Sequence, residues 1–178
     1  MSNDISLIEE SGVATGAVAV YDAVIDVVDW ASVRHVVQIA GGSGAFLAAI
    51  LHRLPESTGV LFDAPEVIAE AGPTLYASGV TDRVDLAGGN LFADIPPGGD
   101  LYIIANQLRG WTAERTLRLL MHCHDVMGKA ARFVVAESVA PPARHSDGWH
   151  SLLTEAGFKV LSTTLTMCGW SVVDAQPA

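Results

Sequence analysis

Cysteine and basic residues are scarce in this chain of 178 residues. Cys123 and Cys168 are the only cysteines and form no Cys-x-x-Cys motif, which is typical of reduced thiols rather than of a disulfide framework. Lys and Arg together number 10 against 20 Asp and Glu, and the formal net charge is -10. The basic residues are scattered, so a polyanion such as DNA or RNA would be repelled at long range. We therefore expect no nucleic-acid partner.

Long apolar runs are missing as well. The most apolar stretch, 35–51, is interrupted by Gln38 and by a glycine-rich turn, whereas a membrane span needs about 20 mostly apolar residues. The first twelve residues are acidic and polar and lack the basic and apolar regions of a secretory signal. We expect no membrane partner and a cytoplasmic location. The sequence also contains no zinc signature and no serine nucleophile elbow, so no metal site is predicted.

Strand-like and helix-like patterns alternate along most of the chain. We expect a flexible tail over residues 1–12 and one α/β domain over 13–178, because the length suits a single core. The expected strands are 35–39, 59–63, 83–87, 100–104, 132–136, 160–165 and 171–174. The expected helices are 14–30, 43–54, 65–79, 112–128 and 147–156. This alternation predicts an open, doubly wound, mostly parallel sheet with helices on both faces.

Two turns at expected strand ends are suited to a nucleoside. In the first, Gly41, Gly42 and Gly44 would let the backbone approach a ligand at the start of a helix, where N–H groups are unpaired. Asp63 ends the next strand about 20 residues later, where a carboxylate can accept both ribose hydroxyls. The alternatives are an ordinary tight turn and an Asp63 helix cap. Because ligands of such sheets bind at the carboxyl ends of the strands, the pair predicts a nucleoside cofactor.

A third turn follows the third expected strand. Asn90 could read an adenine ring there, with Leu91 and Phe92 packed beside it. The alternative is a loop in which the Asn side chain merely supports a turn.

Three stretches carry a resemblance to a known family. They are VVQIAGGSGAFLAAILHRLPESTGVLFDAPEVI, GVTDRVDLAGGNLFADIPPGGDLYIIANQLRGW and WHSLLTEAGFKVL. From about residue 15 onward, the chain resembles the cofactor domain of the plant-type and bacterial natural-product O-methyltransferases. The resemblance implies a Rossmann-like, seven-stranded sheet whose last strand is antiparallel. It also implies that S-adenosylmethionine contacts Gly41, Gly42, Gly44 and Asp63, with Asn90 and Leu91 at the adenine. The implied reaction is O-methylation of a small, secondary-metabolite substrate.

Several positions depart from the family's pattern. The family's strand-one acid, first turn glycine, adenine-side Asp and strand-four Lys are replaced by Gln38, Ala40, Asn90 and Ala105. The family's His-Asp pair, whose His deprotonates the acceptor hydroxyl, is replaced by Arg109-Gly110. Arginine stays protonated at neutral pH and cannot serve as that base. The separate N-terminal helical domain that dimerises the family is also expected to be missing at this length.

Four residues are candidates for the missing catalytic role. Arg109 would hold an anionic acceptor. His145 and His150 flank the position of the family's supporting acid, so either would be a substitute base, and Asp147 adjoins that position. Each also has an ordinary explanation as a solvated surface residue.

Two further functions stay open. The site could be redirected to cyclisation, decarboxylation or isomerisation on the same fold. Alternatively the chain could be a non-catalytic partner protein, with Trp111 and Trp149 in an exposed apolar patch. In either case a second copy or a partner chain would cover the substrate side.

Overall fold

The computed structural model describes residues 19–138 and 146–178. The expected tail over residues 1–12, the candidate base His145 and the side chain of Asp147 lie outside the described part.

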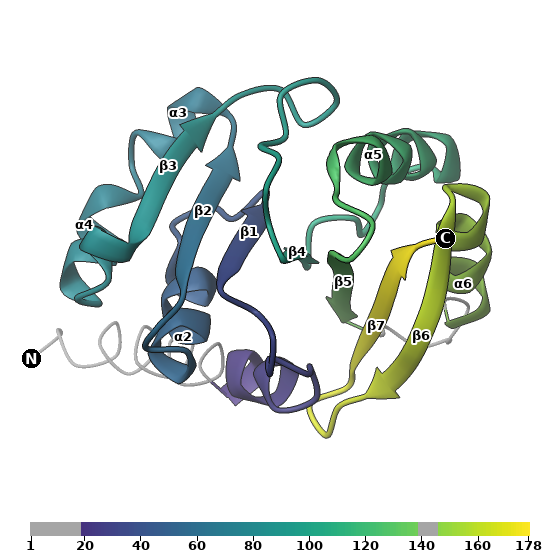
Figure 1. Ribbon diagram of the computed structural model, residues 1–178, viewed down its shortest axis with the longest axis horizontal. Coiled ribbons are helices and arrows are strands. Elements are labelled where there is room, and N and C mark those ends of the chain that lie inside the picture. Colours follow the sequence, from purple (N-terminus) through teal and green to yellow (C-terminus); the bar gives the residue numbers. More distant parts are fainter. Residues whose placement is uncertain (1–18, 139–145) are drawn as a thin grey trace, which may run out of the picture.

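Seven strands form one sheet in the order β3-β2-β1-β4-β5-β7-β6 (Figure 1). The strands are β1 (His35–Ile39), β2 (Thr58–Asp63), β3 (Val84–Gly88), β4 (Leu101–Ala105), β5 (Arg132–Ser138), β6 (Phe158–Leu165) and β7 (Trp170–Pro177). Neighbours among β1 to β5 are parallel, whereas β7 runs antiparallel to both β5 and β6. The predicted Rossmann-like, doubly wound, mostly parallel sheet is confirmed.

Helices cover both faces of this sheet. They are the helical residues 19–25, α2 (Ala45–Arg53), α3 (Pro65–Ile68), α4 (Gly72–Ala77), α5 (Ala113–Val126) and α6 (Ser146–Glu155). Successive strand residues point to opposite faces, so β1 contributes Val37 and Ile39 to one core cluster and Val36 to the other. The first cluster packs under α5 and α6, and the second under α2, α4 and residues 19–25.

Two expected helices end or break well before the sequence suggested. The segment expected as one helix over 65–79 is divided into α3 and α4, and Pro73 lies in the first turn of the second. Proline lacks an N–H and disfavours helical geometry in the residue before it, which explains the break. The first helix ends at Ile25, whose carbonyl accepts a hydrogen bond from Trp30 Nε1 at 2.8 Å.

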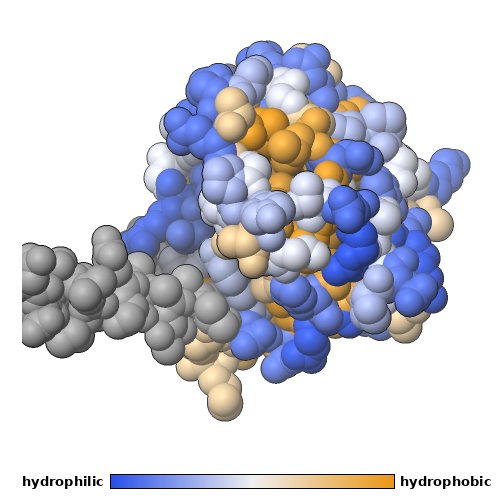
Figure 2. Space-filling view, turned by 90° about the vertical axis from the view of Figure 1, so that its left-hand side faces the viewer, coloured by the Kyte–Doolittle hydropathy of each residue, from blue (hydrophilic) through white to orange (hydrophobic). Residues whose placement is uncertain are grey.

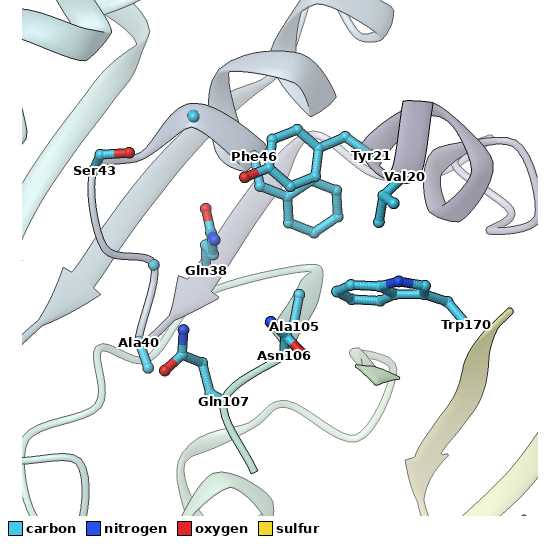
Figure 3. Close-up of a pocket in the computed structure, with 12 residues that line it drawn as sticks. Val20, Tyr21, Gln38, Ala40, Ser43, Phe46, Ala105, Asn106, Gln107 and Trp170 are labelled. Atoms are coloured by element: carbon cyan, nitrogen blue, oxygen red, sulfur yellow. The ribbon is translucent and has the colours of Figure 1, made fainter. Parts of the chain in front are cut away.

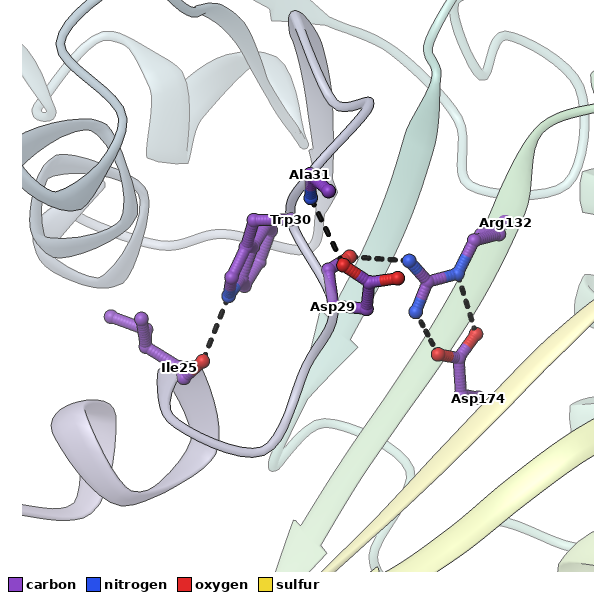
Figure 4. A network of polar contacts seen from close by, with 6 residues as sticks. All are labelled: Ile25, Asp29, Trp30, Ala31, Arg132 and Asp174. Carbon is purple, nitrogen blue, oxygen red and sulfur yellow. Dashed lines mark hydrogen bonds and ion pairs between the residues drawn. The ribbon is translucent and has the colours of Figure 1, made fainter.

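A buried ion pair ties the loop after the first helix to the sheet (Figure 4). Arg132 of β5 donates hydrogen bonds to the carboxylate of Asp174 on β7 and to the backbone carbonyl of Asp29. The two charged side chains are only 16% and 10% exposed, so the pairing of β5 with β7 is fixed by charge as well as by the ladder.

The sheet edges are β3 and β6. Figure 2 looks onto the β3 side of the molecule, where apolar surface gathers between hydrophilic surroundings. Leu86 of the edge strand β3 is exposed. Among the described residues, no helix has both the length and the apolar character that crossing a bilayer requires.

Candidate functional site

The glycine turn joins the carboxyl end of β1 to α2. Ala40, Gly42 and Gly44 all have positive φ, at 52°, 58° and 81°. A Cβ on Gly41 would lie 2.3 Å from Leu61 Cδ1, so this glycine is required by packing. A Cβ on Gly42 would meet nothing within 4 Å. Gly42 therefore presents its backbone to open space, which is the geometry that a ligand approaching the turn requires.

Asp63, at the tip of β2, is hydrogen bonded to this turn. Its Oδ2 accepts from the backbone N–H of Gly42 at 2.9 Å, and its Oδ1 accepts from Ala64 N–H at 2.7 Å. The N-cap residue of α3 is Ala64, so Asp63 is not the helix cap that the sequence left open. A carboxylate has about four acceptor positions, so two positions remain for ligand hydroxyls. The structure thus brings together the two predicted parts of a nucleoside site.

Asn90 and Leu91 follow β3, on the far side of Asp63 from β1. Asn90 Oδ1 accepts from the N–H of Phe92 at 2.9 Å, and the carboxylate of Asp94 accepts from Asn90 N–H at 2.8 Å. Leu91 is half-buried and packs on the core. The side-chain oxygen of Asn90 therefore supports a turn, as the simpler alternative expected, and adenine contacts at Asn90 and Leu91 remain a prediction.

A pocket of about 290 Å³ opens on the other side of the turn, toward β4 (Figure 3). Its lining residues are Val20, Tyr21, Gln38, Ala40, Gly41, Ser43, Ala45, Phe46, Ala105, Asn106, Gln107 and Trp170. None of these lining residues is charged. Gln38 is only 4% exposed, and its Oε1 has no hydrogen-bond partner among the described residues. A buried amide oxygen without a partner costs free energy unless a ligand or water satisfies it, so this pocket is suited to a ligand with a donor or a positive charge.

Glu137 anchors the loop that follows β4. It lies near the end of β5 and is 5% exposed, and its Oε1 accepts from the N–H groups of Gln107 and Leu108, both at 2.8 Å. Burial raises the pKa of the Glu137 carboxyl, while the two N–H donors and then the charge of Arg109 lower it in part. The Glu137 side chain therefore fixes the loop after β4. This loop carries Gln107, which lines the pocket, and Arg109, which follows two residues later.

These observations can be set beside known proteins. A family model described as the O-methyltransferase domain matches residues 2–161. The chain belongs to this family.

The chain is similar to several bacterial proteins. The 3-amino-4-hydroxybenzoate 4-O-methyltransferase of Streptomyces cremeus is 35% identical, over 90% of this chain and 50% of its own length. The solved structure of LaPhzM matches with a TM-score of 0.84 at 30% identity, covering 90% of this chain and 55% of that chain. The aclacinomycin 10-hydroxylase RdmB of Streptomyces purpurascens is 30% identical over 76% of this chain and 36% of its own length. The chain spans about half the length, or less, of these relatives.

The candidate catalytic residues whose side chains the structure describes lie outside the pocket lining, whereas the candidate cofactor residues Gly42 and Asp63 are hydrogen bonded to each other. Arg109 is exposed and close enough to Glu137 for its charge to act on that carboxyl, but it does not line the pocket. His150 is exposed on α6 and is also outside the pocket lining. No group of three potential metal-ligand side chains occurs among the residues described. The roles of Arg109, Asp147 and His150 stay predictions.

Arginine side chains pack against the Trp111 and Phe92 rings. The guanidinium carbon of Arg115 lies 3.9 Å from the centre of the Trp111 ring, and the Phe92 ring lies 6.0 Å from it. Arg118 covers Phe92 at 5.1 Å. Two cations therefore lie over this aromatic pair, and a partner bound to Trp111 remains a prediction.

Sequence reasoning missed several residues of the site. Tyr21 and Phe46 come from distant segments, and nothing in their local pattern marks them as pocket residues. The sequence offers Trp111, Trp149 and Trp170 as large aromatic residues that could line a pocket or pack in the core, and of these Trp170 lines the pocket. Gln38 was noticed only as a departure from the family. Glu137 carried one usable signal, since a single carboxylate ends an otherwise apolar strand at the ligand-binding edge of the sheet.

Proposed function

We propose that the chain binds S-adenosylmethionine and uses it to methylate an oxygen of a small secondary metabolite. The observation that carries this proposal is the joined pair of Asp63 and the glycine turn, with the pocket of Gln38 opening directly beside it. The sheet order β2-β1-β4 puts Asp63 on one side of β1 and the pocket on the other. A nucleoside ligand with a polar tail would lie across the end of β1.

The residues present fit this cofactor. The free acceptor positions of Asp63 suit the two ribose hydroxyls, and the open backbone of Gly42 suits close approach. The Oε1 of Gln38, which has no hydrogen-bond partner among the described residues, gives the pocket an acceptor for a positively charged part of the ligand. Asn90 and Leu91 would contact the adenine, since β3 lies next to β2. When bound, S-adenosylmethionine supplies an electrophilic methyl group on a positively charged sulfur.

The chain's own residues constrain the acceptor. Arg109 stands where the family places its general base, and a guanidinium cannot remove a proton at neutral pH. We propose that Arg109 instead holds an acceptor whose oxygen is already an anion, such as a phenolate or a carboxylate. Losing a general base typically costs 10²- to 10⁴-fold in rate, and an ionised acceptor avoids that cost. His145, Asp147 and His150 are the alternative proton acceptors.

The decisive binding experiment is a melting curve with and without S-adenosylmethionine. A ligand at 100 times its Kd adds about 2.7 kcal/mol to the free energy of unfolding, which shifts the midpoint measurably. We expect a rise with S-adenosylmethionine at millimolar concentration. An unchanged midpoint, together with no heat in titration calorimetry, would rule out the cofactor.

A redirected enzyme is the second candidate. Arg109 in the place of the catalytic His favours it, as does the similarity to a relative that is named a hydroxylase. Product masses separate the two functions. Methylation adds the mass of one methyl group in place of a hydrogen, hydroxylation adds the mass of one oxygen, and isomerisation leaves the mass of the substrate unchanged.

The substrate side would be covered by another chain. We propose that a second copy or a partner completes the acceptor site, because the catalytic candidates Arg109 and His150 are exposed and lie outside the pocket lining. Light scattering on the purified chain tests this, because a monomer that still methylates its acceptor would exclude such a requirement.

A further inference from the structure

The walls of the Gln38 pocket have an unusual composition for a site that would hold a charged group. Figure 3 shows the rings of Tyr21, Phe46 and Trp170 bordering the pocket, with the amide of Gln38 among them. The Tyr21 and Phe46 rings are 4.9 Å apart. The wall therefore offers aromatic rings and amide groups, and none of its lining residues is an acid or a base.

Such a wall discriminates ligands by charge. The faces of aromatic rings carry partial negative charge and attract a cation, most strongly when the site is shielded from water. The Gln38 Oε1, buried and unpartnered among the described residues, adds a carbonyl dipole. The net charge of -10 raises the local concentration of cations further. An uncharged group of the same shape would gain none of these contributions.

The residues that line the pocket carry no formal charge of either sign. No basic side chain among them opposes a positive ligand, and no acidic side chain among them pairs with it. The aromatic rings and the Gln38 carbonyl are therefore the groups of the lining that can stabilise a cation.

We propose that this pocket selects a positively charged sulfur or nitrogen centre, so that the chain binds S-adenosylmethionine more tightly than its uncharged thioether product, S-adenosylhomocysteine. The inference rests on the proposed cofactor and adds to it a preference for charge, which would limit inhibition by the product. Tyr21, Phe46, Trp170 and Gln38 are the residues that produce the preference.

Titration calorimetry with three ligands tests the preference. S-Adenosylmethionine carries a sulfonium, S-adenosylhomocysteine an uncharged sulfur, and sinefungin an ammonium group at the corresponding position. We expect the two cations to bind at least about five-fold more tightly than the thioether, which is the factor that a cation–π contact of about 1 kcal/mol supplies. Sinefungin separates the effect of charge from that of the transferred methyl group.

Variants locate the preference in the wall. Trp170→Leu removes one ring and Gln38→Met removes the amide at similar volume. Each variant should lower the affinity for both S-adenosylmethionine and sinefungin by about three-fold or more. The affinity for S-adenosylhomocysteine should change less than two-fold. Trp149→Leu is the matched control, because Trp149 is also half-buried but lies on α6 outside the pocket. Melting curves without ligand identify any variant that has lost its fold, and Tyr21→Leu then replaces it.

The outcomes separate the two proposals. Equal affinity for the cations and the thioether, or a ratio that Trp170→Leu and Tyr21→Leu leave unchanged, overturns the charge preference and leaves the proposed cofactor standing. No binding of any of the three ligands overturns both.

Discussion

The carboxylate of Asp63 accepts a hydrogen bond from the backbone N–H of Gly42 at 2.9 Å. This bond joins the end of β2 to the turn after β1, two segments about 20 residues apart in sequence. It holds the turn open with Gly42 facing solvent and sets the carboxylate beside it. One side chain therefore both shapes the turn and would bind the ribose.

Replacing Asp63 with Asn should weaken binding of S-adenosylmethionine by about ten- to one-hundred-fold, because hydrogen bonds to a charged group contribute about 1.5–3 kcal/mol. The free energy of unfolding should fall by only about 1 kcal/mol, since an amide oxygen still accepts from Gly42. Calorimetry and urea unfolding measure the two effects. Asp85→Asn on the exposed edge strand makes the same charge change and should leave binding intact. If both variants bound S-adenosylmethionine equally well, Asp63 would not be a cofactor-binding residue.

Ala40→Gly should raise the free energy of unfolding by about 0.5–1 kcal/mol. Ala40 has φ of 52°, and an L-residue pays about 1–2 kcal/mol for this left-handed conformation, part of which is offset by the greater freedom of glycine when unfolded. Chemical denaturation measures the gain. The control is Ala49→Gly within α2, where the same change should cost about 1 kcal/mol. A loss of stability in both variants would show that Ala40 is not strained.

Glu137→Gln should stabilise the fold at neutral pH. Burial raises the pKa of the Glu137 carboxyl, so the folded chain holds that proton more tightly than the unfolded chain does. The corresponding stability is present below the ordinary pKa of a glutamate and is lost as the pH rises through the raised value. The difference in the free energy of unfolding between Glu137→Gln and the original chain should therefore be greatest near neutral pH and shrink toward pH 4.

Glu137→Ala provides the contrast for that measurement. It leaves the N–H groups of Gln107 and Leu108 without their acceptor, which should cost about 2–4 kcal/mol. Urea titrations between pH 4 and 8 would show both effects. A Gln variant as unstable as the Ala variant would mean that the negative charge itself is required.

The two cysteines should differ sharply in reactivity. Cys168 is exposed in the turn between β6 and β7, whereas Cys123 is buried and its burial strongly raises the pKa of its thiol. Since the thiolate is the reactive form, a disulfide reagent at neutral pH should modify one thiol per folded chain and both in denaturant. In the Cys168→Ser variant, no thiol should be modified while the chain is folded. Rapid labelling of Cys123 in the folded chain would contradict the packing of α5.

The sequence alone determined the architecture and predicted the glycine turn and Asp63 that the fold brings together. Strands such as 35–39 and 59–63 are marked by local runs of β-branched and apolar residues, and their order along the chain fixes a doubly wound sheet. The turn glycines and Asp63 could be placed because each follows directly from the end of a strand. Helix ends were less predictable, since the break at Pro73 depends on how α3 and α4 pack.

Only the tertiary structure decided what the pocket is made of. Tyr21, Phe46 and Trp170 border one pocket because the first helix, α2 and the start of the antiparallel strand β7 converge at the carboxyl ends of β1 and β4. Glu137 finds its two N–H partners about thirty residues earlier, on the neighbouring strand's loop. A sequence lists the donors and acceptors that a chain carries. Whether the Gln38 Oε1 is buried and without a partner among the described residues depends on which distant side chains surround it, and folding settles that.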